Sequence, residues 1–305
     1  MNTIPEAKGP RYAPYASGKF QMAMGMVALD LRDWIDVDQN RAVELREKER
    51  LLACQHNAVF GDLHGSEAAQ REVLMLLLDN LELHHPGLIA FDEGKIWIAE
   101  TGKSYCLSEF ADNALDLAGR LVQEDLCLMT PGEKGYVLHA ASLCFPGRWV
   151  LGEKLGRPMM EIHEPVSGYA EKLGKPVDRF FTHLTADKPV SRLNWSILDD
   201  PALFQTSGHS STVRQSGVTA QNAGERLWLR VERQTLRRLP ESGDILFTIR
   251  TFVDPLSSLE ARPDLAMGLR RAVADMPEGM QRYKSLIPFR NALDGYLENL
   301  MERAA

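Results

Sequence analysis

The sequence predicts an α+β fold, an antiparallel sheet with its helices on one side and with helical extensions at the N- and C-terminal ends. The order of the predicted elements supports this class, because two strands, a group of helices and three more strands lack the strand–helix alternation of a parallel sheet. The composition supports a globular protein, since 305 residues with 44% hydrophobic and 25% charged side chains can bury a core without disulfides or a structural metal.

Helices in the N-terminal third are predicted by apolar residues at helical spacing. The pattern places them at 40–56, 66–83 and 113–123. Ser66 is a suitable N-cap for the second helix, and Pro86-Gly87 follows its end as a stop signal. We therefore expect residues 1–87 to form a mostly helical extension that packs on the core.

Strands are predicted where β-branched and aromatic residues alternate with polar ones between turn signals. Asp92-Glu93-Gly94 is a clear hairpin turn between two of them. The predicted strands are 88–91, 95–99, 126–130, 136–145, 192–198, 226–238 and 244–253. They belong to a core at 88–260, in which a proline-broken helical stretch runs to about residue 184.

The end of the chain returns to helical spacing. Helices are expected at 265–274 and 280–302, so that 261–305 forms a C-terminal helical part. The polar, Ser- and Gly-rich segment 205–224 is expected to be a loop. We expect the three parts of the chain to form one compact unit.

The charge and the cysteines exclude several classes of function. A net charge of −7 argues against a nucleic-acid surface, which needs a basic excess. The apolar runs are too short for a membrane span. The four cysteines have no regular spacing, and Cys127 and Cys144 lie in apolar segments as buried thiols would. These features fit a reducing, cytoplasmic environment.

The long hairpin predicted at 226–238 and 244–253 is rich in arginine for an acidic protein. By strand alternation, one face of the first strand carries a polar set and the opposite face carries Leu229 and Val231. The polar set is Trp228, Arg230, Glu232 and Gln234. Two interpretations stay open. The face is solvated, as is common in antiparallel sheets, or its arginines bind an anionic ligand, because guanidinium groups pair with carboxylate and phosphate in a bidentate manner.

His163 is the second candidate for a functional residue. It follows Met159 and Ile162 at spacings that place the three on one helical face, just before the stop at Pro165. A histidine on such a face can be an axial ligand of heme iron. It can equally be a core histidine that is hydrogen-bonded to a carbonyl group. The pattern leaves both possibilities open.

Several long segments, in order along the chain, resemble the alpha subunit of the heme-dependent oxidative N-demethylases, also described as dimethylamine monooxygenases. The segments are DLRDW (30–34), LVQEDLCLM (121–129), AASLCFPGRW (140–149), EKLGRP (153–158), IHEPV (162–166), RLNWS (192–196), LRVERQTLRRLP (229–240) and LFTIRT (246–251). Ser167 departs from the pattern, which has proline at this position, and so does the pair Met159-Met160.

The resemblance implies a fold, an activity and a set of cofactors. The fold is PAS-like, with heme b bound in the core at 88–260. The activity is the oxidative N-demethylation of a small methylated amine such as dimethylamine, with O2 and reducing equivalents, to the demethylated amine and formaldehyde. The electrons come from NADPH through FMN and an iron–sulfur cluster on partner subunits. A PAS-type heme or gas sensor and a non-catalytic scaffold subunit are the alternatives.

The resemblance also suggests roles for individual residues. His163 is the expected axial iron ligand, with Glu161 or Glu164 as the partner of its other ring nitrogen. Arg230 and Arg250 are expected to share a face and to bind the heme propionates. The indole rings expected to contact the heme or the amine are Trp195 and Trp228. The residues expected to line the catalytic side are Arg230, Glu232 and Gln234.

Overall fold

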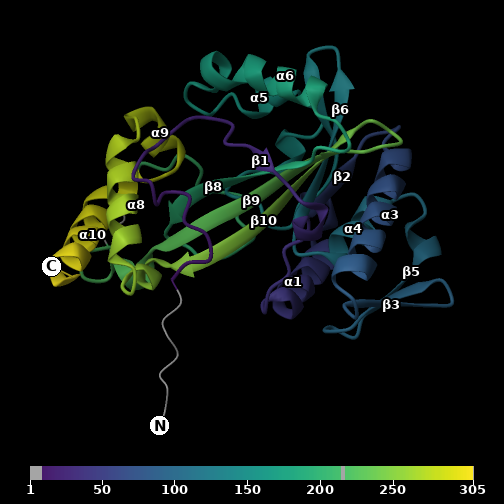
Figure 1. Ribbon diagram of the computed structural model, residues 1–305, viewed down its shortest axis with the longest axis horizontal. Helices are drawn as coiled ribbons and strands as arrows, with labels where there is room; N and C mark the ends of the chain where they lie inside the picture. The colour runs from purple at the N-terminus through teal and green to yellow at the C-terminus, as the bar shows by residue number, and fades with distance from the viewer. Residues whose placement is uncertain (1–8, 214–216, 305) are drawn as a thin grey trace, which may run out of the picture.

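A large antiparallel sheet forms the centre of the computed structural model, which describes residues 9–213 and 217–304 (Figure 1). Within these residues the sheet has seven strands, and each neighbouring pair is antiparallel. In pairing order they are β1 (Val27–Ala28), β8 (Val190–Leu198), β9 (Trp228–Arg238), β10 (Ile245–Pro255), β6 (Asp125–Gly132), β7 (Gly135–Ser142) and β2 (Phe60–Asp62). The predicted α+β class with an antiparallel sheet is confirmed.

A smaller sheet is formed by β3 (Ile89–Asp92), β4 (Lys95–Ile98) and β5 (Ser104–Cys106). The first two strands are the predicted hairpin. Its two turn residues, Glu93 and Gly94, have left-handed φ angles of 45° and 79°, as a two-residue hairpin turn with right-handed strand twist requires. Strand β5 was not predicted, because three residues are too few to show an alternating pattern.

The N-terminal helices match the predicted segments closely. They are α1 (Arg41–Cys54), α2 (His56–Val59), α3 (Glu67–His84) and α4 (Ala114–Leu121), with the short helices η1 (Leu31–Asp33) and η2 (Leu107–Phe110) beside them. Ser66 precedes α3 as predicted, but its side chain makes no cap hydrogen bond. Its hydroxyl oxygen instead accepts a hydrogen bond of 2.9 Å from Gln70 Nε2.

Helices cover both faces of the large sheet, so the prediction of helices on one side is wrong. The first face is the one to which Leu126 and Leu246 point, and these residues share a hydrophobic cluster with α1, α3 and α4. Their neighbours Cys127 and Ile245 point to the second face and share a different cluster with Phe181. Strand alternation alone does not show whether both faces of a sheet are covered.

The second face is covered by η3 (Leu151–Glu153), α5 (Met159–Ile162), the π-helical turn η4 (Ala170–Gly174) and α6 (Lys175–His183). The first face is covered at its far end by α7 (Ala223–Arg226), η5 (Leu256–Leu259), α8 (Pro263–Asp275), α9 (Glu278–Tyr283), η6 (Ile287–Phe289) and α10 (Arg290–Ala304). Figure 1 shows these two helical groups at different places along the long strands β9 and β10. Among the described helices, none has the length and apolar character to span a membrane.

The single helix predicted at 280–302 is wrong. A turn at Lys284–Leu286 separates α9 from η6 and α10. Ser285 has a left-handed φ of 55°, which is uncommon outside glycine, and it is buried. Pro288 has no backbone N–H and cannot continue a helical hydrogen-bond ladder. The break matters because it brings Lys284 to the sheet.

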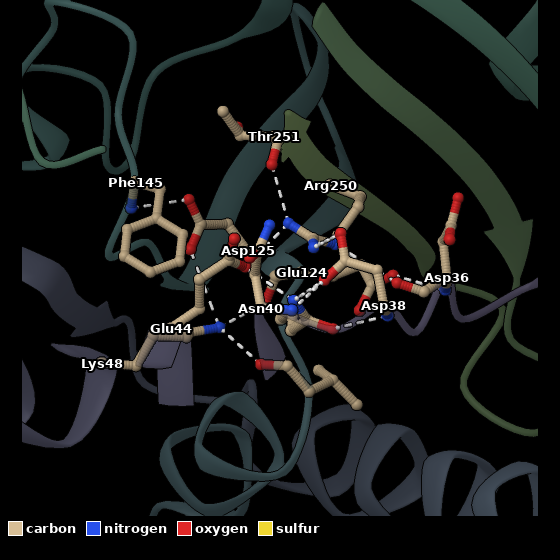
Figure 2. Close-up of polar contacts among 12 residues, drawn as sticks. Asp36, Asp38, Asn40, Glu44, Lys48, Glu124, Asp125, Phe145, Arg250 and Thr251 are labelled. Carbon is tan, nitrogen blue, oxygen red and sulfur yellow. Dashed lines mark hydrogen bonds and ion pairs between the residues drawn. The ribbon is translucent and has the colours of Figure 1, made fainter. Parts of the chain in front are cut away.

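Helix α1 is fastened to the sheet by a buried ammonium group (Figure 2). Lys48 is 0% exposed and donates hydrogen bonds to the carbonyl oxygens of Val122 and Glu124. Its Nζ also lies 3.8 Å from the Asp125 carboxylate at the start of β6. A buried ion of this kind is stable only because its charge and its donors are met by the surrounding groups.

A second buried cation lies beside it in Figure 2. Arg250 of β10 is 1% exposed and forms ion pairs of 2.9 Å with Asp38 and 2.8 Å with Glu44. Burial raises the pKa of Glu44, while the Arg250 charge opposes that rise. The segment that leads into α1 is thereby tied to the central strand β10.

Replacing Lys48 with Met should lower the free energy of unfolding by about 3 to 5 kcal/mol, because it leaves the Asp125 carboxylate buried without its cation. Urea unfolding of the purified protein measures the change. The matched control is Arg46→Met, an exposed position on the same helix, which should change the stability by less than about 0.5 kcal/mol. Equal stabilities of the two variants would contradict the anchoring role of Lys48.

Candidate functional site

A polar patch lies on the second face of β8 and β9, beyond the apolar cluster that packs against α6. It is formed by directly opposed residues of the two strands, whose side chains share a face because antiparallel partners point the same way. The pairs are Arg192 with Gln234, Asn194 with Glu232, and Ser196 with Arg230. The predicted alignment of Arg230, Glu232 and Gln234 on one face is confirmed by this register.

The Glu232 carboxylate is held at the centre of the patch. Its Oε2 accepts hydrogen bonds of 3.0 Å from Gln234 Nε2 and 3.3 Å from Asn194 Nδ2. Its Oε1 lies 3.5 Å from Arg230 Nε. Gly147 passes closely over it, since a Cβ atom at that position would lie 3.2 Å from Oε1. The carboxylate is therefore oriented through one oxygen and covered by a backbone that carries no side chain.

Arg230 lies against this carboxylate, and most of its N–H donors are already used within the chain, so they are not available to a ligand. Its side chain is 1% exposed and donates hydrogen bonds of 2.5 Å to the Phe145 carbonyl oxygen and 3.2 Å to Thr251 Oγ1. Burial lowers the pKa of Arg230, and the Glu232 charge opposes that shift. Its contacts make it a residue that positions Glu232 and the Phe145 backbone.

His163 lies at the end of α5, over the second face. Its Nδ1 lies 2.9 Å from the Met159 carbonyl oxygen, so Nδ1 carries the hydrogen in a neutral ring and Nε2 keeps its lone pair. The expected partners Glu161 and Glu164 are exposed, and the backbone takes their place. The ring stacks on Tyr169 with centroids 4.5 Å apart and an interplanar angle of 12°. Burial lowers the pKa of His163 to about 4.

The turn between α9 and η6 supplies another wall of the site. Lys284 donates hydrogen bonds to the Asn194 side-chain oxygen, at 3.1 Å, and to the Trp195 carbonyl oxygen. Burial lowers the pKa of Lys284 to about 8, and the Glu232 charge opposes that shift. The preceding residue, Tyr283, packs edge-on against His209 with ring centroids 4.8 Å apart. Sequence reasoning missed Lys284 because it placed this residue inside a continuous helix.

Two of the predicted site residues, Arg250 and Trp195, lie on the first face of the sheet, opposite the polar patch. Arg250 is paired with Arg233, and Trp195 is paired with Val231, so all four side chains point to the first face. The prediction that Arg250 shares a face with Arg230 is therefore wrong. The alternation within each strand was correct, but the register between β9 and β10 could not be read from the sequence.

The two predicted tryptophans differ in their surroundings. Trp195 belongs to the C-terminal hydrophobic cluster and packs against Tyr15 with ring centroids 5.6 Å apart. Trp228 lies on the second face, but at the far end of β9, opposite Leu198. Neither indole stands beside His163, so the structure does not bring them together with the predicted ligand.

Two hollows border the site. An open one of about 560 Å³ is lined by Arg148, Gln205 and Gly208, which lie on the two segments that meet above Glu232, and by neighbouring residues of 199–207. A smaller one of about 210 Å³ lies between Met22, Gly168 and the start of α9. Both end at segments that carry site residues, the first next to His209 and the second next to Tyr169.

A comparison with protein families gives an independent match. The family model described as haem-dependent oxidative N-demethylase, alpha subunit-like, matches residues 25–294. This range contains β1 to η6 and every residue of the site described above.

Acidification should destabilise the ligand-free protein through His163. The folded state keeps its pKa near 4, below the ordinary 6.5, so between these pH values only the unfolded chain binds the proton. Stability should fall as the pH is lowered from about 6.5 and should level off below about 4.

Urea unfolding at pH 6.5 and pH 5 measures this effect. The wild type should lose about 2 kcal/mol more than His163→Gln over this interval, at about 1.4 kcal/mol per pH unit. The control His183→Gln changes an exposed histidine at the end of α6 and should keep the wild-type slope. A His163→Gln slope equal to that of the wild type would show that His163 is not held neutral.

Proposed function

The chain belongs to the heme-dependent oxidative N-demethylase, alpha-subunit-like family, and from this premise we propose that it is the heme-binding monooxygenase subunit of an N-demethylase. The proposed substrate is a small methylated amine of the dimethylamine type. O2, two electrons and two protons would convert it to the demethylated amine, formaldehyde and water. The observation that supports this best is His163, a buried imidazole whose Nδ1 is bonded to the Met159 carbonyl oxygen, so that its Nε2 keeps the lone pair an iron ligand needs.

The residues of the site fit heme b. Heme iron is commonly held by a histidine whose second ring nitrogen is bonded to a backbone carbonyl group, and His163 has this arrangement with Met159. The cationic side chains Arg192 and Lys284, beside the same face, fit the negative charge of the porphyrin propionates. When bound, heme would supply the activation of O2. His163 is thus the proposed metal ligand, in agreement with the expectation from the sequence.

Glu232 is the residue that we propose acts on the substrate. Alkylamines resemble the lysine side chain and are protonated near neutral pH. Glu232 Oε1 would accept the N–H of the amine and hold its methyl group in place, and the same oxygen would take the proton that the amine must lose. Gln234 and Arg230 would keep the carboxylate in position. Any side chain at position 147 would crowd Oε1, since a Cβ atom there would lie 3.2 Å from it, so glycine keeps this oxygen from being covered further.

The family description names an alpha subunit, which supports the existence of partner subunits. We propose that the electrons come from NADPH through FMN and an iron–sulfur cluster on separate reductase subunits. The present chain would bind the heme, the amine and O2. Addition of such a reductase to the heme-loaded chain is the direct way to test this division of tasks.

Heme ligation by His163 is tested by titrating the purified protein with hemin and recording the Soret band. The wild type should bind about one heme per chain, and His163→Ala should lose the band or shift it strongly. His183→Ala, the control, should keep the wild-type spectrum. An unchanged spectrum in His163→Ala would contradict the ligand assignment.

The hemin titration, together with an assay of formaldehyde release after addition of the reductase and the amine, separates the proposed function from its alternatives. Heme binding without amine-dependent formaldehyde release would favour a sensor. A wild type that takes up no heme would favour a scaffold subunit and would remove the basis of the proposal.

Glu232→Gln should lower kcat/KM for the amine by about 10² or more, because the amide keeps the size of the side chain but cannot take a proton. Formaldehyde release measures the turnover, with hemin affinity as the control quantity. Glu161→Gln, an exposed position on α5, is the matched variant and should be unaffected. Full activity in Glu232→Gln would refute the role of Glu232.

A further inference from the structure

Arg192 is a partly buried arginine whose guanidinium Nε lies buried without a hydrogen-bond partner among the described residues. It lies on β8, on the second face. The carboxylate diagonally opposite it on β9, Glu232, accepts hydrogen bonds from Gln234, Asn194 and Arg230 instead. Burial lowers the pKa of Arg192. A buried donor atom without a partner is costly and calls for an explanation.

The arginines of the β9–β10 hairpin show that this chain usually provides partners for guanidinium groups that point into the protein. Arg233 donates to the carbonyl oxygens of Trp34 and Asp33, and Arg250 pairs with two carboxylates. Arg237 also has an unpartnered Nε, but its guanidinium group lies over the Trp34 ring, 4.5 Å from the centroid. Among the described residues, Arg192 forms no ion pair with a carboxylate, and its guanidinium group lies over no aromatic ring.

A second unmet group lies close to the first. Tyr169 is 5% exposed, and its hydroxyl has no partner within residues 9–213 and 217–304. Burial raises the pKa of Tyr169 to about 12, and the Arg192 charge opposes that rise, so the two groups act on each other. The Tyr169 ring is the one that stacks on His163. The Arg192 Nε and the Tyr169 hydroxyl are thus two neighbouring hydrogen-bond donors, and neither has an acceptor among the described residues.

We propose that Arg192 and the Tyr169 hydroxyl form a carboxylate-binding site for a propionate of the porphyrin. A carboxylate accepts two parallel hydrogen bonds from a guanidinium group and a third from a hydroxyl group. Tyr169 stacks on His163, the proposed iron ligand. A propionate at the edge of a porphyrin bound by His163 would therefore lie near Arg192 and the Tyr169 hydroxyl. The assignment rests on the proposed function and replaces the earlier expectation for Arg250.

The same chemistry would also suit a carboxylate on the substrate, such as that of an N-methylated amino acid. The cofactor is favoured because both unmet groups are buried beside the stacked pair His163–Tyr169, whereas the proposed amine position at Glu232 already has its own polar partners. The two sources are distinguished by a probe that changes only the propionates.

The experiment compares the affinity of the apoprotein for hemin and for hemin dimethyl ester, in which both propionates are esterified. The wild type should prefer hemin by at least about tenfold, and Arg192→Met should reduce the preference to near one. Tyr169→Phe keeps the ring on His163 and should reduce the preference by about threefold. Arg237→Met, the same change on the other face, should keep the wild-type preference.

Urea unfolding of the apoprotein provides a second test that needs no ligand. Removing a partly buried guanidinium group whose Nε lacks a partner among the described residues should leave the unfolding midpoint of Arg192→Met unchanged or raise it. A lower midpoint would show that Arg192 is held by contacts within the chain and would overturn the proposal.

The other possible results of the hemin comparison also decide between the proposal and its alternatives. An undiminished preference for hemin in Arg192→Met would overturn the assignment, and if KM for an N-methylated amino acid rose at the same time, the carboxylate would be that of the substrate. A wild type that binds neither porphyrin would refute the proposed function itself. Failure of the function thus appears in the wild type, whereas failure of this inference appears only in the variant.

Discussion

The Asp125 carboxylate is the group that links the N-terminal helices on one face of the sheet to the polar patch on the other. It is fully buried, and it is met by Lys48 of α1 on one side and by the N–H groups of Cys144 and Phe145, each at 2.8 Å, on the other. The Phe145 carbonyl oxygen in turn accepts a hydrogen bond from Arg230, the residue beneath Glu232. A chain of polar contacts therefore runs from an N-terminal helix through the sheet to the site. Because each member satisfies the next, loss of one leaves a buried charge or donor unpaired.

The arginines of the hairpin have different tasks because alternation sends them to different faces. Those on the first face meet carbonyl oxygens and carboxylates of the N-terminal segment, and they fasten it to the sheet. On the second face, Arg230 and Arg238 also donate to groups within the chain, whereas Arg192 of the neighbouring strand β8 has a buried Nε without a partner among the described residues. Arg230, on this face of β9, is buried and bonded within the chain, which argues against a solvated face at that position. Binding of an anion stays a proposal, and it rests on Arg192 of β8.

The sequence predicted what depends on local periodicity and missed what depends on contacts distant in the chain. Helices α1, α3 and α4 and the two long strands have strong patterns and were predicted within a few residues. The shared face of Arg230 and Glu232 follows from alternation within one strand. The face on which Arg250 lies, relative to Arg230, depends on the register in which β10 pairs with β9, and Lys284 reaches the site only because the chain turns at Ser285. Arg192 gave no signal, since an unmet donor is visible only when its surroundings are known.

The charges of the site indicate in which order its ligands would bind. Arg192, Arg230 and Lys284 act on the surroundings of a single carboxylate, Glu232, so the empty site has an excess of positive charge. A protonated amine brought there alone would meet this excess at low dielectric, where repulsion between like charges is strong. A porphyrin with two propionates would neutralise this excess and leave Glu232 free to accept a cation. Under the proposed function, heme loading is therefore a condition for amine binding and not only for the chemistry that follows.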